Sequence, residues 1–141
     1  MIAYLDTSAA VKLVIDEPGS SEATRIWSAA RSVASSVLLY PEARAALKRA
    51  ARERRLSAPQ LRYATSAFER LWAQVAQIGV TTSLARRAGT LADEQDLRGY
   101  DAVHLASAEL LRSDALVFVA ADRDLLAAAR RLGFAIARLP R

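Results

Sequence analysis

Four acidic residues stand at points where the chain changes from apolar to polar sequence: Asp6, Glu42, Asp101 and Asp122. If folding brings them together, they form a carboxylate cluster. Hard divalent cations such as Mg²⁺ and Mn²⁺ prefer oxygen ligands of this kind. A cation held in this way can stabilise both the attacking and the leaving oxygen of a phosphodiester. These residue types therefore favour a metal-dependent nuclease.

The composition limits the sites that this chain can build. Its 141 residues are 52% hydrophobic, which suits one domain with a real core, and we expect residues 1–141 to form that domain. There is no cysteine and only one histidine, His104, which argues against a zinc site. The longest apolar stretch, residues 115–121, is too short to span a membrane. We therefore expect a soluble, cytoplasmic protein.

The charge is basic, with a net value of +5 at pH 7, and all but two of the basic residues are arginines. Arginine suits bidentate contact with phosphate, so the composition is compatible with a nucleic-acid partner. A genomic base composition that favours alanine and arginine codons explains the excess of arginine and the positive net charge equally well.

Short apolar runs alternate with segments of helical spacing. Strands are predicted over residues 2–5, 33–35, 80–82, 115–120 and 134–137, with helices between them. Ser20 or Ser21 is the expected cap of the second helix, and Ser57 begins a capping box that opens a helix ending near Gly79. The alternation predicts a three-layer α/β domain with a mainly parallel central sheet flanked by helices.

This architecture offers the acids a common location. Open parallel sheets build sites at the carboxyl ends of their strands, near a switch in strand order. Asp6 and Asp122 occupy two such ends, while Glu42 and Asp101 lie early in helices, where the backbone dipole favours a carboxylate. Taken singly, each acid is explained as well by capping or by an ordinary solvated position.

Four segments give the chain a resemblance to a known family: YLDTSAAVKLVIDEPGS, PEARAALKRA, GYDAVHLASAEL and FVAADRDLLAAARRLG. They occur in the expected order and sample nearly the whole length. The sequence resembles a PIN domain and, within that superfamily, a VapC-type ribonuclease toxin of bacterial toxin–antitoxin systems. Each segment alone is a weak motif, and their order and spacing make the resemblance specific.

The resemblance implies a PIN-like fold, an RNA substrate and a site that holds Mg²⁺ or Mn²⁺ on Asp6, Glu42, Asp101 and Asp122. Asp6 and Asp101 are expected to be the firmest ligands, Asp122 a further ligand, and Glu42 a ligand or a proton acceptor. The expected products carry 5′-phosphate and 3′-hydroxyl ends. The resemblance also implies a homodimer and a cognate VapB-type antitoxin whose C-terminal segment covers the acidic crevice.

Neighbouring residues leave alternatives open. Thr7 is a candidate for contact with the metal shell or the scissile phosphate, whereas helix capping is favoured for Ser8. Asp124 competes with Asp122 as the fourth acid, and Asp122 is favoured because it directly follows the apolar run. The family often has a threonine two residues before that acid, and Ala120 stands there in this chain.

Three further features have a structural and a functional interpretation. His104 is expected to be a buried or bridging histidine rather than a catalytic one. The basic residues between Arg44 and Arg55 either track an RNA backbone or form an ordinary solvated helix face. Trp27 and Trp72 are expected in core packing or a subunit contact rather than in base stacking.

Competing functions fit less well. A haloacid dehalogenase-type phosphatase needs a second aspartate where Ser8 stands, and a response-regulator receiver needs a late lysine, whereas Lys12 and Lys48 lie early. Two alternatives stay open within the same superfamily. One is an RNA-processing PIN nuclease without an antitoxin, and the other is a catalytically silent PIN-fold binding module.

Overall fold

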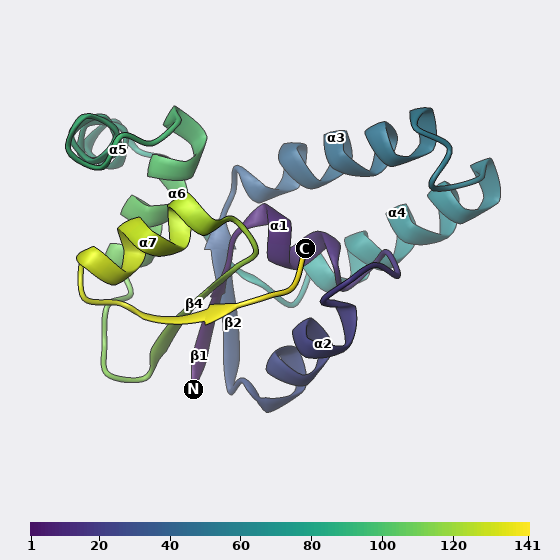
Figure 1. The fold of residues 1–141 in the computed structure, drawn as a ribbon, viewed down its shortest axis with the longest axis horizontal. Helices are drawn as coiled ribbons and strands as arrows, with labels where there is room; N and C mark the ends of the chain where they lie inside the picture. Colours follow the sequence, from purple (N-terminus) through teal and green to yellow (C-terminus); the bar gives the residue numbers. More distant parts are fainter.

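A five-stranded sheet, parallel throughout, runs through the middle of the computed structural model, which describes residues 1–141 (Figure 1). The strands are β1 Ile2–Leu5, β2 Ser32–Ser36, β3 Ala76–Ile78, β4 Leu116–Ala120 and β5 Ala135–Arg138. Seven helices connect and cover them: α1 Thr7–Val11, α2 Ser20–Ala29, α3 Leu39–Arg52, α4 Ala58–Trp72, α5 Thr82–Gln95, α6 Gly99–Glu109 and α7 Arg123–Arg131. The predicted α/β class with a parallel sheet is confirmed.

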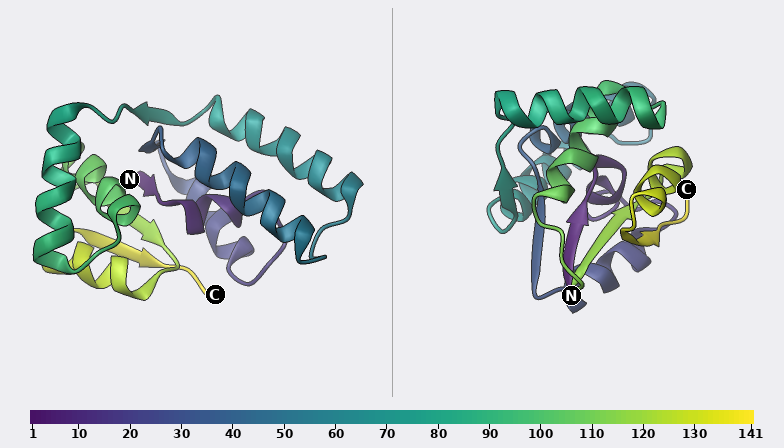
Figure 2. Two further views of the ribbon diagram at one scale, coloured as in Figure 1. Left: turned by 90° about the horizontal axis from the view of Figure 1, so that it is seen from above. Right: turned by 90° about the vertical axis from the view of Figure 1, so that its left-hand side faces the viewer.

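The helices form a layer on each face of the sheet. Two views at right angles show α5, α6 and α7 on one face and α1 to α4 on the other (Figure 2). Because successive strand residues point to opposite faces, Ala3 and Leu5 pack with α1, α3 and α4, whereas Tyr4 packs with the α5–α7 layer. Each face thus buries its own hydrophobic cluster.

The strand order is β3-β2-β1-β4-β5, which places β1 at the centre of the sheet. β1 pairs with β2 on one side and with β4 on the other, where Tyr4 lies opposite Phe118. The chain therefore changes direction of winding between β1 and β4, and the carboxyl ends of these two strands lie side by side. A parallel sheet forms binding sites at this type of position.

Two local predictions around the third strand differ from the structure. The third strand is Ala76–Ile78 rather than residues 80–82, and α4 ends at Trp72, well before Gly79. Ala76–Ile78 pairs with β2, while the hydroxyl of Thr81 accepts a hydrogen bond from the Leu84 amide and caps α5. Capping by a hydroxyl therefore outweighs the β-propensity of the Val-Thr-Thr run.

The cap of α2 also differs from the prediction. Gly19 occupies it with a φ of 92°, a left-handed conformation that glycine adopts without strain. The Ser20 hydroxyl instead donates to the Ile15 carbonyl oxygen and accepts from the Glu17 amide.

None of the helices is both long and apolar enough to cross a lipid bilayer.

Candidate active site

The four acids predicted from the sequence line one cavity of about 650 Å³ at the carboxyl end of the sheet. Asp6 directly follows β1 and caps α1, accepting from the Ala9 amide, and Asp122 follows β4 after one residue and caps α7, accepting from the Leu125 amide. Asp101 lies in the first turn of α6 and Glu42 in the first turn of α3. Capping and cavity lining are thus compatible roles, because each cap leaves one carboxylate oxygen free of the helix. We call Asp6, Glu42, Asp101 and Asp122 the acidic floor.

Asp6 is the most deeply buried member of the acidic floor, with 4% of its surface exposed. Its Oδ1 accepts from the Ser8 hydroxyl at 2.7 Å and from the Ala9 amide at 3.1 Å. Burial raises the pKa of Asp6 from the ordinary 3.8 to about 6, and the nearby Asp101 carboxylate adds to the rise. A buried carboxylate in this state gains from any cation brought next to it.

Ser8 connects the two strand ends that carry acids. Its hydroxyl donates to Asp6 and accepts from the Ala121 amide at 2.9 Å, and Ala121 directly precedes Asp122. The helix-capping role favoured for Ser8 from the sequence is wrong, because Asp6 caps α1 and the Ser8 hydroxyl instead joins Asp6 to Ala121. This pair of bonds fixes the spacing between the ends of β1 and β4.

Arg98 lies between two carboxylates of the acidic floor. Its guanidinium contacts Oδ2 of Asp101 at 3.0 Å and Oδ2 of Asp122 at 3.4 Å, and it stacks 4.8 Å from the centre of the Tyr100 ring. Burial raises the pKa of Asp101, and Asp122 raises it further, while Arg98 opposes both. The hydrogen bond to Asp101 raises the pKa of Arg98 in turn.

Glu42 is held from two sides. The Thr7 hydroxyl donates to its Oε1 at 2.7 Å, and Nε2 of His104 lies 2.7 Å from the same oxygen. His104 is 1% exposed and also contacts the Tyr4 hydroxyl, so the prediction of a buried, bridging histidine is confirmed. Burial raises the pKa of Tyr4, which keeps its phenol protonated.

Basic side chains line the side of the cavity formed by the C-terminal half of α3 and the turn after it. Arg49, Arg52 and Arg55, which we call the basic wall, face the same space as the acidic floor, together with Lys12 and Arg141. The Lys12 ammonium is buried and engaged by Glu17 and the Pro18 carbonyl oxygen. The cavity therefore combines a negative base with a positive side.

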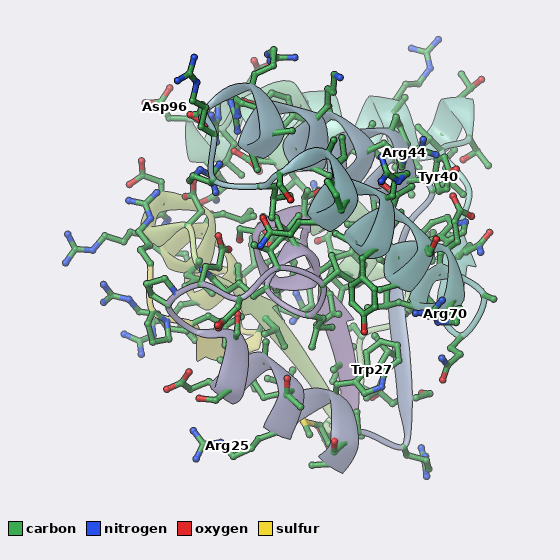
Figure 3. The ribbon with its side chains drawn as sticks, turned by 90° about the vertical axis from the view of Figure 1, so that its right-hand side faces the viewer. Arg25, Trp27, Tyr40, Arg44, Arg70 and Asp96 are labelled. Atoms are coloured by element: carbon green, nitrogen blue, oxygen red, sulfur yellow. The ribbon has the colours of Figure 1, made fainter.

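Not all of the basic residues predicted near this helix face the cavity. Arg44 lies beside Tyr40 (Figure 3), donates to its hydroxyl at 2.8 Å and pairs with Glu69. Lys48 does not line the cavity either. Trp27 and Trp72 pack against the α1–α4 core, which confirms the structural interpretation of these aromatics.

Asp124 lies apart from the acidic floor. It is exposed in the first turn of α7 and does not line the cavity, although Asp122 two residues earlier does. The start of α7 turns the two side chains in different directions.

The donor set fits a hard divalent cation, because the acidic floor supplies carboxylate oxygens and includes Asp6, a buried acid whose pKa is raised by burial. With the side chains as they stand, no three His, Asp or Glu residues group closely enough to hold one ion. Arg98, whose side chain is 61% exposed, contacts two of the four acids and occupies the space between them.

Sequence reasoning missed Arg98 and Tyr4 as parts of this site. Arg98 precedes Asp101 by three residues, a spacing at which side chains meet on a helix, so a local signal was available. Tyr4 gave no signal, because its contact with His104 joins residues 100 positions apart.

A family model and a protein of similar sequence both match nearly the full length of this chain. The family model for the PIN domain matches residues 3–131. Ribonuclease VapC49 of Mycobacterium tuberculosis is 41% identical over 136 residues, which cover 96% of this chain and 94% of that protein.

Two solved structures show the same fold. VapC20 of Mycobacterium tuberculosis, a toxin that cleaves the sarcin–ricin loop, aligns with a TM-score of 0.70 and 24% identity over 96% of this chain and 98% of its own. A toxin–antitoxin complex from Klebsiella pneumoniae contains a chain that aligns with a TM-score of 0.63 and 22% identity, covering 86% of this chain and 88% of that one.

Proposed function

Because this chain belongs to the PIN domain family, we propose that its acidic cavity is the active site of a metal-dependent endoribonuclease. The protein is a VapC-type ribonuclease toxin of a toxin–antitoxin pair, and it hydrolyses phosphodiester bonds. The observation that supports the location of the site is the meeting of Asp6, Glu42, Asp101 and Asp122 in one cavity at the switch point of the sheet.

Asp6, Asp101 and Asp122 would hold Mg²⁺ or Mn²⁺, with Glu42 as a further ligand or as the proton acceptor. A cation bound there supplies positive charge against the negative charge that develops on the phosphate during hydrolysis. The raised pKa of Asp6 and of Asp101 fits this role, since a cation stabilises the ionised form that burial disfavours.

Among the residues of this site, Glu42 would accept a proton from the attacking water. Its carboxylate lines the cavity and is kept in position by contacts with Thr7 and His104. The water oxygen then bonds to phosphorus, the bond from phosphorus to the 3′ oxygen breaks, and that oxygen leaves as a hydroxyl after taking up a proton. The products carry 5′-phosphate and 3′-hydroxyl ends. Thr7 lines the cavity and would contact the substrate phosphate there.

The basic wall would contact the phosphates on either side of the scissile bond. Arg49 and Arg52 are exposed and have no ion pair with an acid, so they are available to an RNA backbone. Such contacts carry charge rather than base identity, and they position the strand over the acidic floor.

We propose that this protein binds a VapB-type antitoxin and forms a homodimer. We also propose that it acts in the cytoplasm and that residues 1–141 form one domain. The toxin–antitoxin complex of similar fold supports the antitoxin. A partner that presents a basic side chain would compete with Arg98 for Asp101 and Asp122. Light scattering of the purified chain, alone and after co-expression with the antitoxin, measures both assemblies.

Cleavage of total cellular RNA by the purified protein tests the proposed function. Reactions with Mg²⁺ or Mn²⁺ are compared with reactions in EDTA and with an Asp6→Asn variant, and the fragment ends are read by sequencing. We expect discrete, metal-dependent cuts that the variant does not make.

Absence of cuts from folded, antitoxin-free protein would contradict the nuclease assignment. Calorimetric titration of Mg²⁺ and Mn²⁺ then separates the alternatives. Binding equal to that of an Asp6→Asn, Asp101→Asn double variant would support a catalytically silent binding module.

A further inference from the structure

A chain of buried polar side chains runs from the sheet to the Glu42 carboxylate. Tyr4 in β1 is fully buried, and His104 in α6 is 1% exposed. The Tyr4 hydroxyl lies 2.9 Å from Nδ1 of His104, and Nε2 of the same ring lies 2.7 Å from Oε1 of Glu42. His104 therefore links a strand in the interior to a carboxylate at the cavity.

The hydrogen bonds around Tyr4 determine where the protons lie. The Ser36 amide donates to the Tyr4 oxygen at 3.2 Å. A tyrosine phenol has an ordinary pKa of about 10, so at neutral pH it keeps its own proton and needs an acceptor for it. Nδ1 of His104, 2.9 Å away, is placed to accept it, although the Ser35 and Ser107 hydroxyls also lie near the phenol. With the phenol proton directed at Nδ1, that nitrogen is unprotonated and the N–H of the ring is on Nε2, facing Glu42.

The opposite tautomer fits neither end of the chain. A proton on Nδ1 would face the Tyr4 hydroxyl and turn the phenol proton away from this 2.9 Å contact. It would also turn the lone pair of Nε2 toward the Glu42 carboxylate, where both groups would be acceptors. The Nε2-protonated form gives every member of the chain a matched partner.

The geometry points to Tyr4 and His104 as positioning residues, in which Tyr4 fixes the Nε2-protonated tautomer and this N–H holds Glu42 in place. Tyr4 does not line the cavity, and His104 lines it only with its buried ring, whose Nε2 is bonded to Glu42, so both residues act through Glu42. The inference rests on the proposed function only in taking Glu42 as part of the active site.

Aromatic packing holds the chain of hydrogen bonds from Tyr4 through His104 to Glu42, which we call the relay, in one arrangement. The Tyr4 ring stacks on Phe118 with 5.3 Å between ring centres and meets the His104 ring edge-on at 5.9 Å. Phe118 belongs to β4, the strand whose end leads to Asp122. Tyr4 and Phe118 thus belong to the two strands whose ends lead to Asp6 and Asp122, and buried second-layer contacts of this kind orient the groups in front of them.

Nitrogen NMR of protein labelled with ¹⁵N-histidine tests the relay directly. The chain contains one histidine, so the imidazole nitrogens give a single, unambiguous set of signals. We expect Nε2 protonated and Nδ1 unprotonated in the full chain at neutral pH in EDTA. A proton on Nδ1, alone or on both nitrogens, would overturn the inference.

A Tyr4→Phe variant tests the role of the hydroxyl while keeping the ring. We expect the Nδ1 signal to shift because it loses its hydrogen bond, and kcat to fall about 10- to 100-fold, the range typical of second-layer contacts, with KM unchanged. Tyr40→Phe is the matched control, because it removes a hydroxyl bonded to the Glu69 carboxylate outside the cavity. Unchanged histidine signals with unchanged kcat in Tyr4→Phe would contradict the relay.

Two substitutions of His104 separate positioning from simple packing. His104→Gln keeps an N–H donor near the position of Nε2, whereas His104→Leu keeps bulk without a donor. We expect His104→Gln to recover a large part of the kcat lost in His104→Leu, and equal kcat in the two variants would show that only packing matters. If the wild-type protein cleaves no RNA, the proposed function fails, yet the NMR measurement still decides whether the relay exists.

Discussion

The acidic floor and the basic wall line one cavity, but their side chains are held in different ways. Every carboxylate of the floor is engaged by the protein: Ser8 binds Asp6, Arg98 binds Asp101 and Asp122, and Thr7 with His104 binds Glu42. In the wall, Arg49 and Arg52 are exposed and make no side-chain hydrogen bond, and Arg55 pairs only with Glu17 and Glu53 at the surface.

This difference matches two kinds of work. A cation site needs oxygen atoms at fixed positions, and the floor obtains them from strand ends and helix caps in the rigid centre of the fold. Contact with a nucleic-acid backbone needs positive charge within reach of phosphates whose positions vary, and long exposed arginines provide it. Substitutions in the floor should therefore act on chemistry, and substitutions in the wall on binding.

The largest effect is expected from one of the two aspartates at the start of α7, where Asp122 is the cap and Asp124 lies in the first turn. Asp122→Asn should lower kcat by at least about 100-fold, beyond the range seen for second-layer contacts, because it removes a charge from the floor. Asp124→Asn changes the same charge outside the cavity and should retain most activity. Cleavage kinetics on one RNA at saturating Mn²⁺ measure both, and the reverse ranking would transfer the role to Asp124.

The second prediction concerns stability and pH. The folded pKa of Asp6 is about 6 against an ordinary 3.8, so the folded protein binds more protons than the unfolded chain between these values. The Asp6 contribution to stability is therefore present below about pH 4 and is lost as the pH rises through 6. A difference of about two in pKa corresponds to about 3 kcal/mol.

Asp6→Asn should thus raise the free energy of unfolding by about 3 kcal/mol at pH 8 and by close to zero at pH 4. Asparagine keeps the oxygen that caps α1 and accepts from Ser8. Urea unfolding in EDTA across this range measures the difference between variant and wild type. If the difference in the free energy of unfolding between variant and wild type did not change with pH, ionisation of Asp6 would not destabilise the folded protein.

The third prediction addresses the basic wall. Replacing Arg49, Arg52 and Arg55 with glutamine should raise KM about tenfold at low salt and leave kcat nearly unchanged. The slope of log affinity against log salt should shrink by about 0.7 for each lost phosphate contact. Arg44→Gln with Lys48→Gln is the matched control on the same helix outside the cavity. If the control pair raised KM as much as the wall substitutions, RNA binding would depend on the overall positive charge of the protein and not on the basic wall.

The smallest effect is expected at Arg98, the exposed arginine that contacts Asp101 and Asp122 of the acidic floor. Arg98→Gln should strengthen Mn²⁺ binding by up to about fivefold at pH 8, because exposed ion pairs are worth at most about 1 kcal/mol and this one competes with the cation for Asp101 and Asp122. Arg87→Gln is the control, since it breaks a similar exposed pair with Glu109 away from the cavity. Weaker Mn²⁺ binding in Arg98→Gln would show that the arginine supports the site instead.

The sequence was sufficient for the parts of this molecule that follow from local pattern. The apolar runs ending in Asp6 and Asp122 are strands because their residues pack on both faces, and parallel pairing then places both acids at one edge. The capping box at Ser57 is likewise visible in the spacing of its residues.

Other parts depend on contacts between distant segments. β3 is a partly exposed edge strand of Ala, Gln and Ile, and only its pairing with β2 makes it a strand. The bond between Tyr4 and His104, and the reach of Arg98 to Asp122, exist because the sheet and α6 fix their relative positions. No pattern within one segment contains that information.

The central place of β1 also bears on how this toxin is made. β1 emerges first from the ribosome but pairs with β4, and the Ser8 hydroxyl meets the Ala121 amide across 113 positions of sequence. Such a distant contact forms only after β4 and the residue that follows it have been synthesised. A growing chain that has not yet reached Ala121 therefore lacks the joined strand ends on which Asp6 and Asp122 meet, and it carries no complete acidic floor.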